Sequence, residues 1–530
     1  ERLGRRLRRD GVAAWDLTFS ADKSVSLLWA LGNDQTRRQV LEAFEEATSQ
    51  AFGYLEEVAS STRGATKTPV LDDSGNPVLN EDGSPKVRVQ TWPIATSGYV
   101  AASFTEFTSR ADDPQLHTHV VVANKVKGKG ALWRTLDGRL LYRHQLAAGY
   151  LHEAVLRQEL TERLGVRWQP VRNGMADIEG FTRGQIEAFS RRRSELEAWR
   201  EEQGLPETLA ARQAAVLATR TPKQDHGLGE LEEQWTQRAL EVGLTPRTIR
   251  RMMNRSRRIA SPDPQLLAEQ LASPGGLTEK ASTFGRAEVV KELAVSLPGG
   301  GTRANIETLA DDFLAGREVI PVLEVAEPAP PTGSMAVADE EPTTAPQPLR
   351  QRRGGLFPGS PERRFTTSEL LRIEERVLRR ALYGQGAGRW RSPRRLLERV
   401  LGRHPELTAG QREMVRRFAT SGDGLEVGVG PAGSGKTAVM AVLAELAMLT
   451  ATPILGAALA ARAAVGLQTA SRISSFTLTK LLAEAEDTGG LPKGVVMVVD
   501  EASMVGTRQL AALSDLVHEA EGKLILIGDD

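Results

Sequence analysis

A glycine-rich loop constrains the fold of this chain more than any other feature. Residues 430–437, with the sequence GPAGSGKT, fit the phosphate-binding P-loop pattern in full. The apolar run 425–429 before them predicts a strand, and residues 438–447 after them predict a helix. A glycine-rich turn formed by chance is the alternative, but the motif requires this strand–loop–helix context. The pattern therefore predicts an α/β nucleotide-binding domain.

The residues of this loop have separate expected roles. Gly430, Gly433 and Gly435 let backbone N–H groups wrap the phosphates of a nucleotide. Lys436 is expected to reach the β- and γ-phosphates, and Thr437 to bind Mg²⁺. We therefore expect ATP and Mg²⁺ at this site.

A second apolar run completes the expected nucleotide site. Residues 495–499 predict a buried strand, and Asp500 and Glu501 follow it directly. Asp500 is expected to hold Mg²⁺ through water, and Glu501 to polarise the attacking water. Two solvated carboxylates at a strand end are the alternative, which the P-loop partner disfavours.

Two histidines one residue apart mark a different kind of site in the N-terminal part. His117 and His119 precede the apolar run 120–123, and residues i and i+2 of a strand point to the same face. Neutral imidazole is the commonest metal ligand in proteins, so the pair could hold one cation. A strand with two solvated histidines is the alternative. The chain has only 7 histidines in 530 residues, so a chance pairing is uncommon.

Three segments together carry a family resemblance: residues 15–26 (WDLTFSADKSVS), 104–110 (FTEFTSR) and 113–119 (DPQLHTH). They resemble the relaxase domain of MobF-type (TrwC/TraI-like) conjugative relaxases, a branch of the HUH nucleases. The resemblance implies an α+β domain with an antiparallel sheet and helices. It implies that His117 and His119 are two of three metal-ligating histidines, and that Asp16 is the acidic residue near the nucleophile. Asp16 could accept the proton of the nucleophile or orient a ligating histidine; a turn carboxylate beside a strand is the alternative.

The first departure from the family concerns the third ligand. Where the family has its third histidine, this chain has Glu106. We expect Glu106 to be the third ligand, which would tilt the preference towards Mg²⁺ or Mn²⁺ because hard cations favour oxygen. A degenerate site with a solvated glutamate is the alternative. His144 and His152 are other candidates, although His152 lies in an apolar-periodic helix and is better explained by packing.

The second departure concerns the nucleophile. The family cleaves with a tyrosine near the start of the protein and forms a 5′-phosphotyrosine bond. The chain begins at Glu1, and none of its 5 tyrosines precedes Asp16. We therefore expect a fragment without its N-terminal segment, which binds DNA and metal but does not nick.

The C-terminal part resembles the RecD-like superfamily-one helicases that follow the relaxase in MobF proteins. Gln411, in the segment 407–411, resembles their adenine-reading glutamine, although Thr408 and Gln411 also fit a helix capping box. Residues 456–464 resemble the segment that contacts single-stranded DNA, with a buried alanine-rich helix as the alternative. Residues 524–529 resemble the start of the next motif. The resemblance implies a RecA-like lobe without its second lobe, so we expect weak nucleotide binding and no translocation.

Charge and composition add limited support. Lys+Arg and Asp+Glu are both 68, so the net charge gives no sign of a nucleic-acid partner. We expect Lys23 and Arg110 to contact DNA phosphates, with solvated surface residues as the alternative. The chain has no cysteine, which excludes disulfides and zinc–thiolate sites. No apolar run approaches the roughly 18 residues of a membrane span.

Composition changes predict five regions: 1–222, a helical region (223–323), a proline-rich linker (324–360), a helical lead-in (361–406) and 407–530. The resemblances imply that the first is a relaxase domain without its N-terminal tyrosine segment and that the last is an incomplete first RecA-like α/β lobe. The acidic and proline-rich composition of the linker is typical of extended, disordered chain. Thr366 and Glu369 fit a capping box at the start of the lead-in helix.

The leading interpretation is a DNA relaxase-helicase of conjugative transfer in the bacterial cytoplasm. It would nick single-stranded DNA at a transfer origin with a metal-dependent tyrosine mechanism and unwind the duplex with ATP. Its expected partners are origin DNA, a type IV secretion coupling protein and accessory DNA-binding proteins. A non-catalytic DNA-binding module attached to a RecD-like ATPase is the alternative. A stand-alone repair helicase with an unrelated N-terminal domain is a third reading, disfavoured by the neighbourhood of the histidine pair.

Overall fold

The computed structural model describes residues 11–72, 75–80, 82–128, 132–219, 227–255, 261–322, 363–431 and 433–528. The backbone divides into two compact units. The first contains Glu1–Leu271, Phe284–Gly316 and Pro321–Arg364; the second contains Ala272–Thr283, Arg317–Ile320 and Phe365–Asp530. Among the described helices, none combines the length and apolarity that crossing a bilayer requires.

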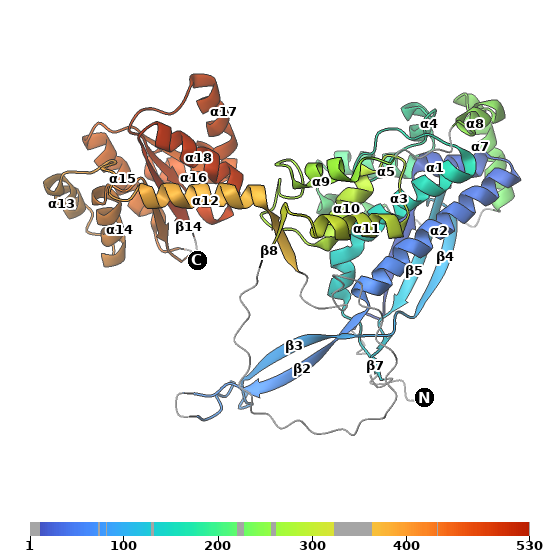
Figure 1. Cartoon of the computed structure of the whole chain (residues 1–530), viewed down its shortest axis with the longest axis horizontal. Helices are drawn as coiled ribbons and strands as arrows, with labels where there is room; N and C mark the ends of the chain where they lie inside the picture. Colours follow the sequence, from blue (N-terminus) through green and yellow to red (C-terminus); the bar gives the residue numbers. More distant parts are fainter. Residues whose placement is uncertain are drawn as a thin grey trace. The chain divides into compact units, whose positions relative to one another are not determined.

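A three-stranded antiparallel sheet organises the first unit. Its strand order is β1-β5-β4, with β1 (Ala14–Ser20), β4 (Ala101–Thr108) and β5 (Pro114–Ala123). One face of β5 is buried, and α1 (Lys23–Leu31) packs against this strand. Two long helices, α2 (Asp34–Ala59) and α3 (Gly138–Leu164), pack on each other beside the sheet. Figure 1 shows α2 and α3 in blue and cyan next to β4 and β5. The other face of the sheet is left open for a site.

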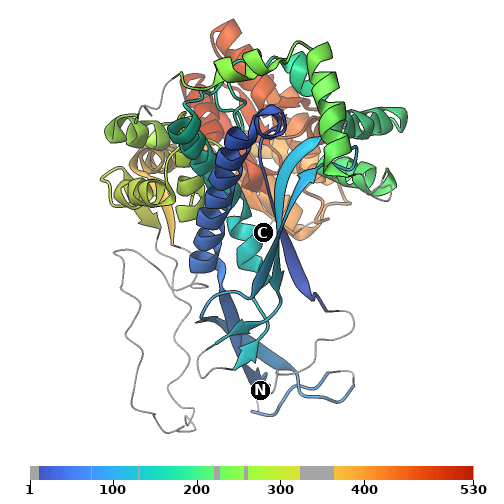
Figure 2. The ribbon, with the colours of Figure 1, turned by 90° about the vertical axis from the view of Figure 1, so that its right-hand side faces the viewer.

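A long β-hairpin follows α2. β2 (Ser61–Pro69) pairs with β3 (Val87–Ala95) along their whole length, from Ser61↔Ala95 to Pro69↔Val87. The pairing continues beyond these strands through the bridges Leu71↔Pro77 and Leu79↔Pro85. In both views the hairpin projects away from the helices of its own unit (Figure 1, Figure 2). The sequence between residues 72 and 85 is rich in Gly, Pro, Asn and Asp, which are the residue types that turns favour.

Helices form most of the rest of the first unit, and the sequence predicts a helical region at residues 223–323. Trp235 on α7 is fully buried, stands edge-on to Trp29 of α1, and donates its indole N–H to the carbonyl of Asp112 at 2.8 Å. The helical region is therefore packed onto the sheet domain within one unit. The bounds of these elements are β6 (Val126–Lys127), β7 (Trp133–Arg134), α4 (Arg183–Ala188), α5 (Arg191–Glu202), α6 (Leu209–Ala218), α7 (Leu228–Glu241), α8 (Pro246–Met252), α9 (Pro264–Ala272), α10 (Arg286–Ser296), α11 (Arg303–Leu314) and β8 (Val319–Val322).

A five-stranded parallel sheet with the order β10-β14-β13-β11-β12 forms the second unit. Its elements are β9 (Arg364–Thr367), α12 (Ser368–Tyr383), α13 (Arg394–Arg403), α14 (Ala409–Thr420), β10 (Leu425–Val429), α15 (Lys436–Leu449), β11 (Ile454–Ala458), α16 (Ala461–Ser471), β12 (Ser474–Thr477), α17 (Leu478–Thr488), β13 (Val496–Val499), α18 (Thr507–Glu519) and β14 (Lys523–Gly528). Strands joined through helices give the predicted α/β P-loop fold.

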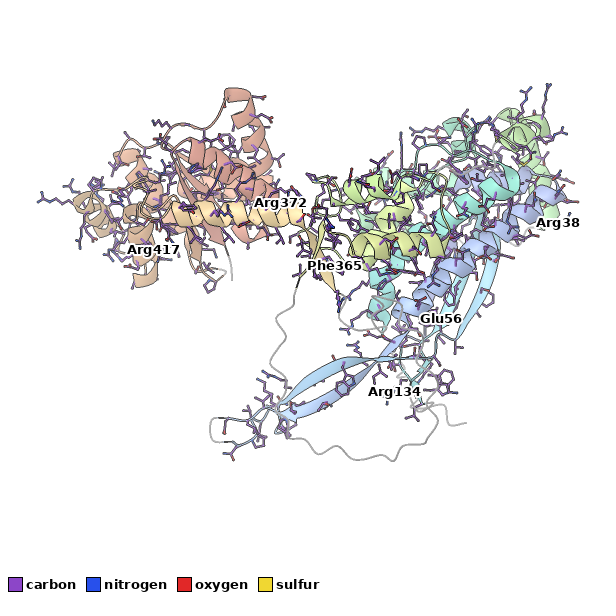
Figure 3. The ribbon with its side chains drawn as sticks, viewed as in Figure 1. Arg38, Glu56, Arg134, Phe365, Arg372 and Arg417 are labelled. Atoms are coloured by element: carbon purple, nitrogen blue, oxygen red, sulfur yellow. The ribbon has the colours of Figure 1, made fainter. Side chains whose placement is uncertain are left out.

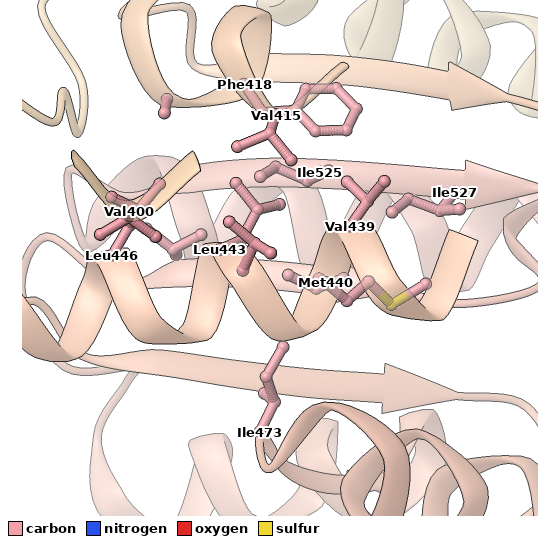
Figure 4. Packing of buried hydrophobic residues seen from close by; sticks show 14 of the residues in the cluster. Val400, Val415, Phe418, Val439, Met440, Leu443, Leu446, Ile473, Ile525 and Ile527 are labelled. Carbon is pink, nitrogen blue, oxygen red and sulfur yellow. The ribbon is translucent and has the colours of Figure 1, made fainter. Parts of the chain in front are cut away.

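The core of this sheet forms around α15. Val439, Met440 and Leu443 are buried on one side of the helix, against Ile525 and Ile527 of β14 (Figure 4). Burying each such side chain stabilises the fold by roughly 1.5–3 kcal/mol. This packing fixes the start of α15, and with it the glycine-rich loop, against the end of the sheet.

The expected capping box of the lead-in helix is wrong, and the expected linker lies outside the described residues. Thr367, and not Thr366, caps α12: its hydroxyl accepts the N–H of Leu370 at 3.2 Å. Thr366 instead lies within β9, and its hydroxyl donates to the carbonyl of Ser282 at 2.8 Å. The expected linker, residues 324–360, lies outside the described residues.

Candidate metal centre and nucleotide site

The middle strand of the three-stranded sheet carries the histidine pair. Along β5, buried residues alternate with partly exposed ones, and His117 and His119 both fall on the partly exposed face. Leu116, Val120 and Val122 occupy the buried face. Because side chains alternate along a strand, the same pattern that buries the apolar residues turns both imidazoles towards the open face. Their ring centroids are 5.1 Å apart.

Each histidine is held by a contact to its Nδ1 atom. His119 Nδ1 lies 2.9 Å from both carboxylate oxygens of Asp16, and Thr18 Oγ1 lies 3.3 Å away. His117 Nδ1 lies 2.9 Å from the backbone carbonyl of Gln115 and donates to it. A proton held on Nδ1 leaves the lone pair of Nε2 available to a cation. Both rings are therefore oriented as metal ligands usually are.

Glu106 completes a group of three potential ligands. Register places it directly opposite His117 on β4, and its Oε2 lies 3.5 Å from His117 Nε2. One ligand atom from each of Glu106, His117 and His119 lies within 4.8 Å of the others. The side chain of Glu106 is 43% exposed, so a cation could reach it from solvent. Two imidazole nitrogens and a carboxylate oxygen are a donor set that fits a divalent cation.

The two alternative histidines lie elsewhere. His144 and His152 are buried on α3, where His144 Nδ1 is 2.9 Å from the hydroxyl of Tyr54. The ring of His152 packs against Phe19 and Phe44. Burial lowers the pKa of His144 to about 4 and that of His152 to about 3. Neither belongs to the cluster of potential ligands in the described residues.

The glycine-rich loop of the second unit has the backbone of a phosphate-binding loop. Gly433 and Gly435 both have φ of +77°, a left-handed conformation that side chains disfavour. A Cβ at Gly435 would also approach Gln411 Nε2 to 2.3 Å. Lys436 begins α15, and its Nζ donates to the carbonyls of Gly430 and Pro431 at 2.7 and 3.1 Å. The ammonium thus lies inside its own loop.

Gln411 and the second carboxylate motif border this loop. Gln411 takes part in the capping box of α14 with Thr408, and its Nε2 also donates to the carbonyl of Ser434 at 2.7 Å. Asp500 and Glu501 follow β13, whose carboxyl end lies at the same edge of the parallel sheet as the loop after β10. Glu501 is exposed and has φ of +53°, a sparsely populated conformation for a residue other than glycine. The lysine, Thr437 and the two carboxylates thus meet at one edge of the sheet, where nucleotides bind in such folds.

Comparison with known families gives two matches. Residues 1–79 and 86–242 match the family model of the TrwC relaxases, and residues 406–530 match that of an AAA domain. The chain therefore has a region similar to the TrwC relaxases, here called the relaxase domain, followed by a region similar to AAA domains, here called the AAA domain. The antiparallel sheet of the relaxase domain and the parallel sheet of the AAA domain are those that the sequence predicts.

Several known proteins are similar to parts of the chain. The multifunctional conjugation protein TraI of Escherichia coli is 29% identical over 329 residues, which are 58% of this chain and 17% of TraI. The probable conjugal transfer protein TraA of Sinorhizobium fredii is 32% identical over 167 residues, 31% of this chain and 15% of TraA. A solved structure of the conjugative relaxase TrwC with origin DNA is 28% identical, covers 46% of this chain and 77% of that chain, and has a TM-score of 0.37. The chain therefore spans less than a fifth of the length of these two curated relatives.

The two basic residues expected at DNA phosphates differ in their surroundings. Lys23 is largely enclosed: its Nζ donates to the carbonyl of Pro114 at 2.7 Å, and burial lowers its pKa to about 8. Arg110 is exposed in the turn between β4 and β5. The relaxase domain thus uses Lys23 to hold the start of β5, whereas Arg110 is accessible to a ligand.

A cleft of about 1130 Å³ lies beside the candidate metal centre of the relaxase domain. Gln115 lines it and shares the partly exposed face of β5 with His117 two residues later. Arg172, Arg192 and Arg193 also line it, but acidic residues such as Asp177 balance them. The basic and acidic side chains that line the cleft are equal in number, so it has no excess of positive charge.

Sequence reasoning missed the part played by Thr18 and by the Gln115 backbone in orienting the histidines. Thr18 is paired with His119 across β1 and β5, and Ser20 with His117. The alternation of polar residues in β1 (Asp16, Thr18, Ser20) was the available signal. Every second side chain of a strand lies on the same face, so a strand that borders a polar site has a polar residue at every second position.

Proposed function

We propose that this chain is the relaxase domain and the first motor lobe of a conjugative relaxase-helicase. The proposal rests on the TrwC relaxase and AAA matches and on relatives named as conjugation proteins. Its substrate would be single-stranded DNA at a transfer origin, in the bacterial cytoplasm. A coupling protein of a type IV secretion system and accessory DNA-binding proteins would be its partners.

The observation that carries this proposal is the cluster of Glu106, His117 and His119. A divalent cation held there would neutralise charge on a scissile phosphate and orient it for attack by a hydroxyl. The attacking hydroxyl would be that of a tyrosine, as the family resemblance implies. A transesterification of this kind keeps the energy of the broken bond in a covalent intermediate.

Asp16 is proposed to act through His119. Its two oxygens, both 2.9 Å from His119 Nδ1, hold the proton on that nitrogen and direct Nε2 to the cation. We therefore propose that Asp16 positions His119, in preference to the role of accepting the proton of the nucleophile.

Glu106 is proposed to select the cation. A carboxylate in place of a third imidazole adds a negative charge and a hard oxygen donor to the site. Such a donor set favours Mg²⁺ or Mn²⁺ over softer ions relative to three imidazoles. With the cleft beside it close to neutral, the cation itself would supply the attraction for the phosphate.

The hairpin β2–β3 is proposed to contact double-stranded DNA next to the site. A two-stranded β-ribbon fits the major groove of a duplex. Lys67, Lys86 and Arg88 lie on this hairpin and are exposed, as is Trp92 with 45% of its surface accessible. Arg110 is a further proposed phosphate contact.

In the AAA domain, we propose that ATP and Mg²⁺ bind at the loop that begins α15. Lys436 would leave the carbonyls of Gly430 and Pro431 for the phosphates, Thr437 and Asp500 would hold Mg²⁺, and Glu501 would orient water. Gln411 already contacts this loop through Ser434, so it is close enough to the loop to contact the bound nucleotide.

Calorimetric titration with Mn²⁺ in the absence of nucleotide tests the metal centre. We expect one site, with affinity lowered at least about 100-fold by His119→Ala and about 10-fold by Glu106→Ala, because each removes a donor or its charge. His404→Ala and Glu46→Ala, at positions outside the cluster, serve as matched controls and should leave the Mn²⁺ affinity unchanged. Unchanged binding in Glu106→Ala would refute the carboxylate ligand. Unchanged binding in His119→Ala would favour the non-catalytic DNA-binding module instead.

A further inference from the structure

The helix α12 carries a row of arginines on one side. Arg372, Arg376 and Arg379 are 69%, 50% and 66% exposed, and Arg380 is 26% exposed. Tyr383 ends the helix and is 86% exposed. From Arg372 to Tyr383 the helix advances about 17 Å, so this row is far longer than a single small anion. Figure 3 labels Arg372 on this helix.

These residues border a cavity of about 680 Å³ in the AAA unit. The row forms one wall together with Arg389, and the starts of β10 and β14 and the end of α18 form the rest. Leu425 and Leu524 mark those strand starts. The glycine-rich loop follows the other end of β10, about 13 Å along the strand. The cavity is therefore separate from the nucleotide site.

The cavity carries an excess of positive charge. Five arginines line it, against one glutamate, Glu375, which pairs with Arg379 at 2.6 Å. Asp515 on α18 serves both Arg376 and Arg380, and Glu318 lies 3.7 Å from Arg372. Five arginines thus face three carboxylates, and the remaining positive charge attracts an anion, since charges in a partly enclosed site interact strongly.

We propose that this arginine-lined cavity binds single-stranded DNA. A positive groove that tracks the backbone, with an aromatic side chain on which a base can stack, is the arrangement that binds single strands without sequence preference. Here successive arginines four residues apart lie about 6 Å apart along α12, and Tyr383 offers its ring at the end of the row. The site goes beyond the proposed functions of the metal centre and of the P-loop, and does not depend on nucleotide hydrolysis.

A dye placed at the cavity tests the proposal in the full chain. The sequence has no cysteine, so Ala387→Cys, at an exposed position that lines the cavity, gives a single labelling point. A 20-nucleotide thymidine oligomer should change the dye fluorescence in a saturable way. Arg372→Gln with Arg379→Gln should weaken this signal about tenfold and reduce the slope of log affinity against log salt by about 1.4, or ~0.7 for each lost phosphate contact.

Matched variants separate the alternatives. Arg395→Gln with Arg399→Gln, on the exposed side of α13, removes the same charge and should leave the signal unchanged. Tyr383→Ala should weaken it roughly tenfold with the salt slope retained, because stacking carries no charge. A dye that stays silent while the anisotropy of the oligomer reports binding elsewhere would overturn the proposal. So would an equal response to inorganic phosphate, or to polyglutamate of the same charge. Mn²⁺ binding in these variants reports separately on the metal centre.

Discussion

At the scale of single residues, hydrogen bonds to Nδ1 decide what the two histidines can do. The Asp16 carboxylate and the Gln115 carbonyl both accept from Nδ1, so both rings present Nε2 to the same space as Glu106. A histidine without such a partner would divide its population between two tautomers and several ring orientations. The candidate metal centre is thus preorganised by groups outside the cluster of potential ligands.

Asp16→Asn tests this preorganisation. An amide of the same shape can donate to Nδ1 as well as accept from it, so the tautomer is no longer fixed. We expect Mn²⁺ affinity to fall roughly 10- to 100-fold, as for other partners of ligating histidines. Calorimetry measures it, and Asp312→Asn on the exposed side of α11 is the control. An affinity equal to that of the unmodified chain would show that Asp16 has no positioning role.

Buried His152 predicts a dependence of stability on pH. Burial lowers its pKa to about 3, so the folded protein keeps it neutral while the unfolded chain protonates it below about pH 6.5. The unfolded state then binds the extra proton, and the free energy of unfolding falls as pH falls through this window. Neighbouring Glu153, whose pKa burial raises to about 8, stays protonated there in the folded state.

His152→Leu should remove the pH dependence of the free energy of unfolding that His152 causes. Relative to the unmodified chain, the variant should gain about 1.4 kcal/mol in free energy of unfolding for each pH unit between pH 6.5 and pH 4. Urea unfolding followed by tryptophan fluorescence measures the difference. His404→Leu is the contrasting control: Glu445 and Glu406 raise the pKa of His404, so its loss should remove stability at low pH. Parallel pH curves for His152→Leu and the unmodified chain would contradict the prediction.

At the scale of elements, the β2–β3 hairpin stands apart from the sheet that carries the site. Its strands pair with each other and not with β1, β4 or β5. Gly64 lets the ring of Trp92 lie across the ribbon, since a Cβ there would come within 2.5 Å of it. Apolar residues such as Val87 and Val89 are exposed on the ribbon, which suits a surface that another molecule covers.

Shortening the hairpin tests its proposed part in DNA binding. Replacing residues 67–89 by Asn-Gly joins the paired residues Thr66 and Gln90 through a turn that hairpins favour. The variant should bind a duplex with a single-stranded tail at least tenfold more weakly, with a salt slope smaller by about 0.9 for each lost phosphate contact. Mn²⁺ binding and affinity for the single strand should be retained. Equal duplex affinity in the shortened chain would remove the hairpin from the interface.

At the scale of the whole molecule, two units with separate cores carry two separate chemistries. The metal cluster and its cleft use residues of the first unit only, and the P-loop and its carboxylates use residues of the second only. Each site can therefore be disabled without disturbing the other.

Lys436→Ala should abolish binding of a fluorescent ATP analogue, or weaken it at least about 30-fold, because it removes the cation that we propose to bind the β- and γ-phosphates. Lys493→Ala, with a side chain 79% exposed, is the control. Mn²⁺ binding at the relaxase site should be unaffected. Unchanged nucleotide binding in Lys436→Ala would reject the P-loop assignment.

The sequence predicts both sheets, the P-loop and the face on which the histidines lie, because each depends on local periodicity or a fixed spacing. Asp16 is less predictable, since its contact to His119 spans 103 residues and depends on the register of β1 against β5. Lys23 illustrates the limit: the sequence cannot tell that its ammonium is enclosed and bonded to Pro114. The arginine-lined cavity also escapes sequence reading, because α12, β10, β14 and α18 come together only in the folded unit.

The position of Glu106 on β4, the outer strand of the three-stranded sheet, has a consequence for how the metal preference can change. The histidines lie on β5, where His117 and His119 are each paired with residues of both β1 and β4 and each alternate side chain belongs to the core. A one-residue slip there would replace the two histidines by Leu116 and Thr118, or by Thr118 and Val120. A replacement at residue 106 alters one donor and leaves the pairing of the other two intact. The metal preference of the relaxase domain can therefore be changed by a substitution on its outer strand, and Glu106→His is the first substitution to make.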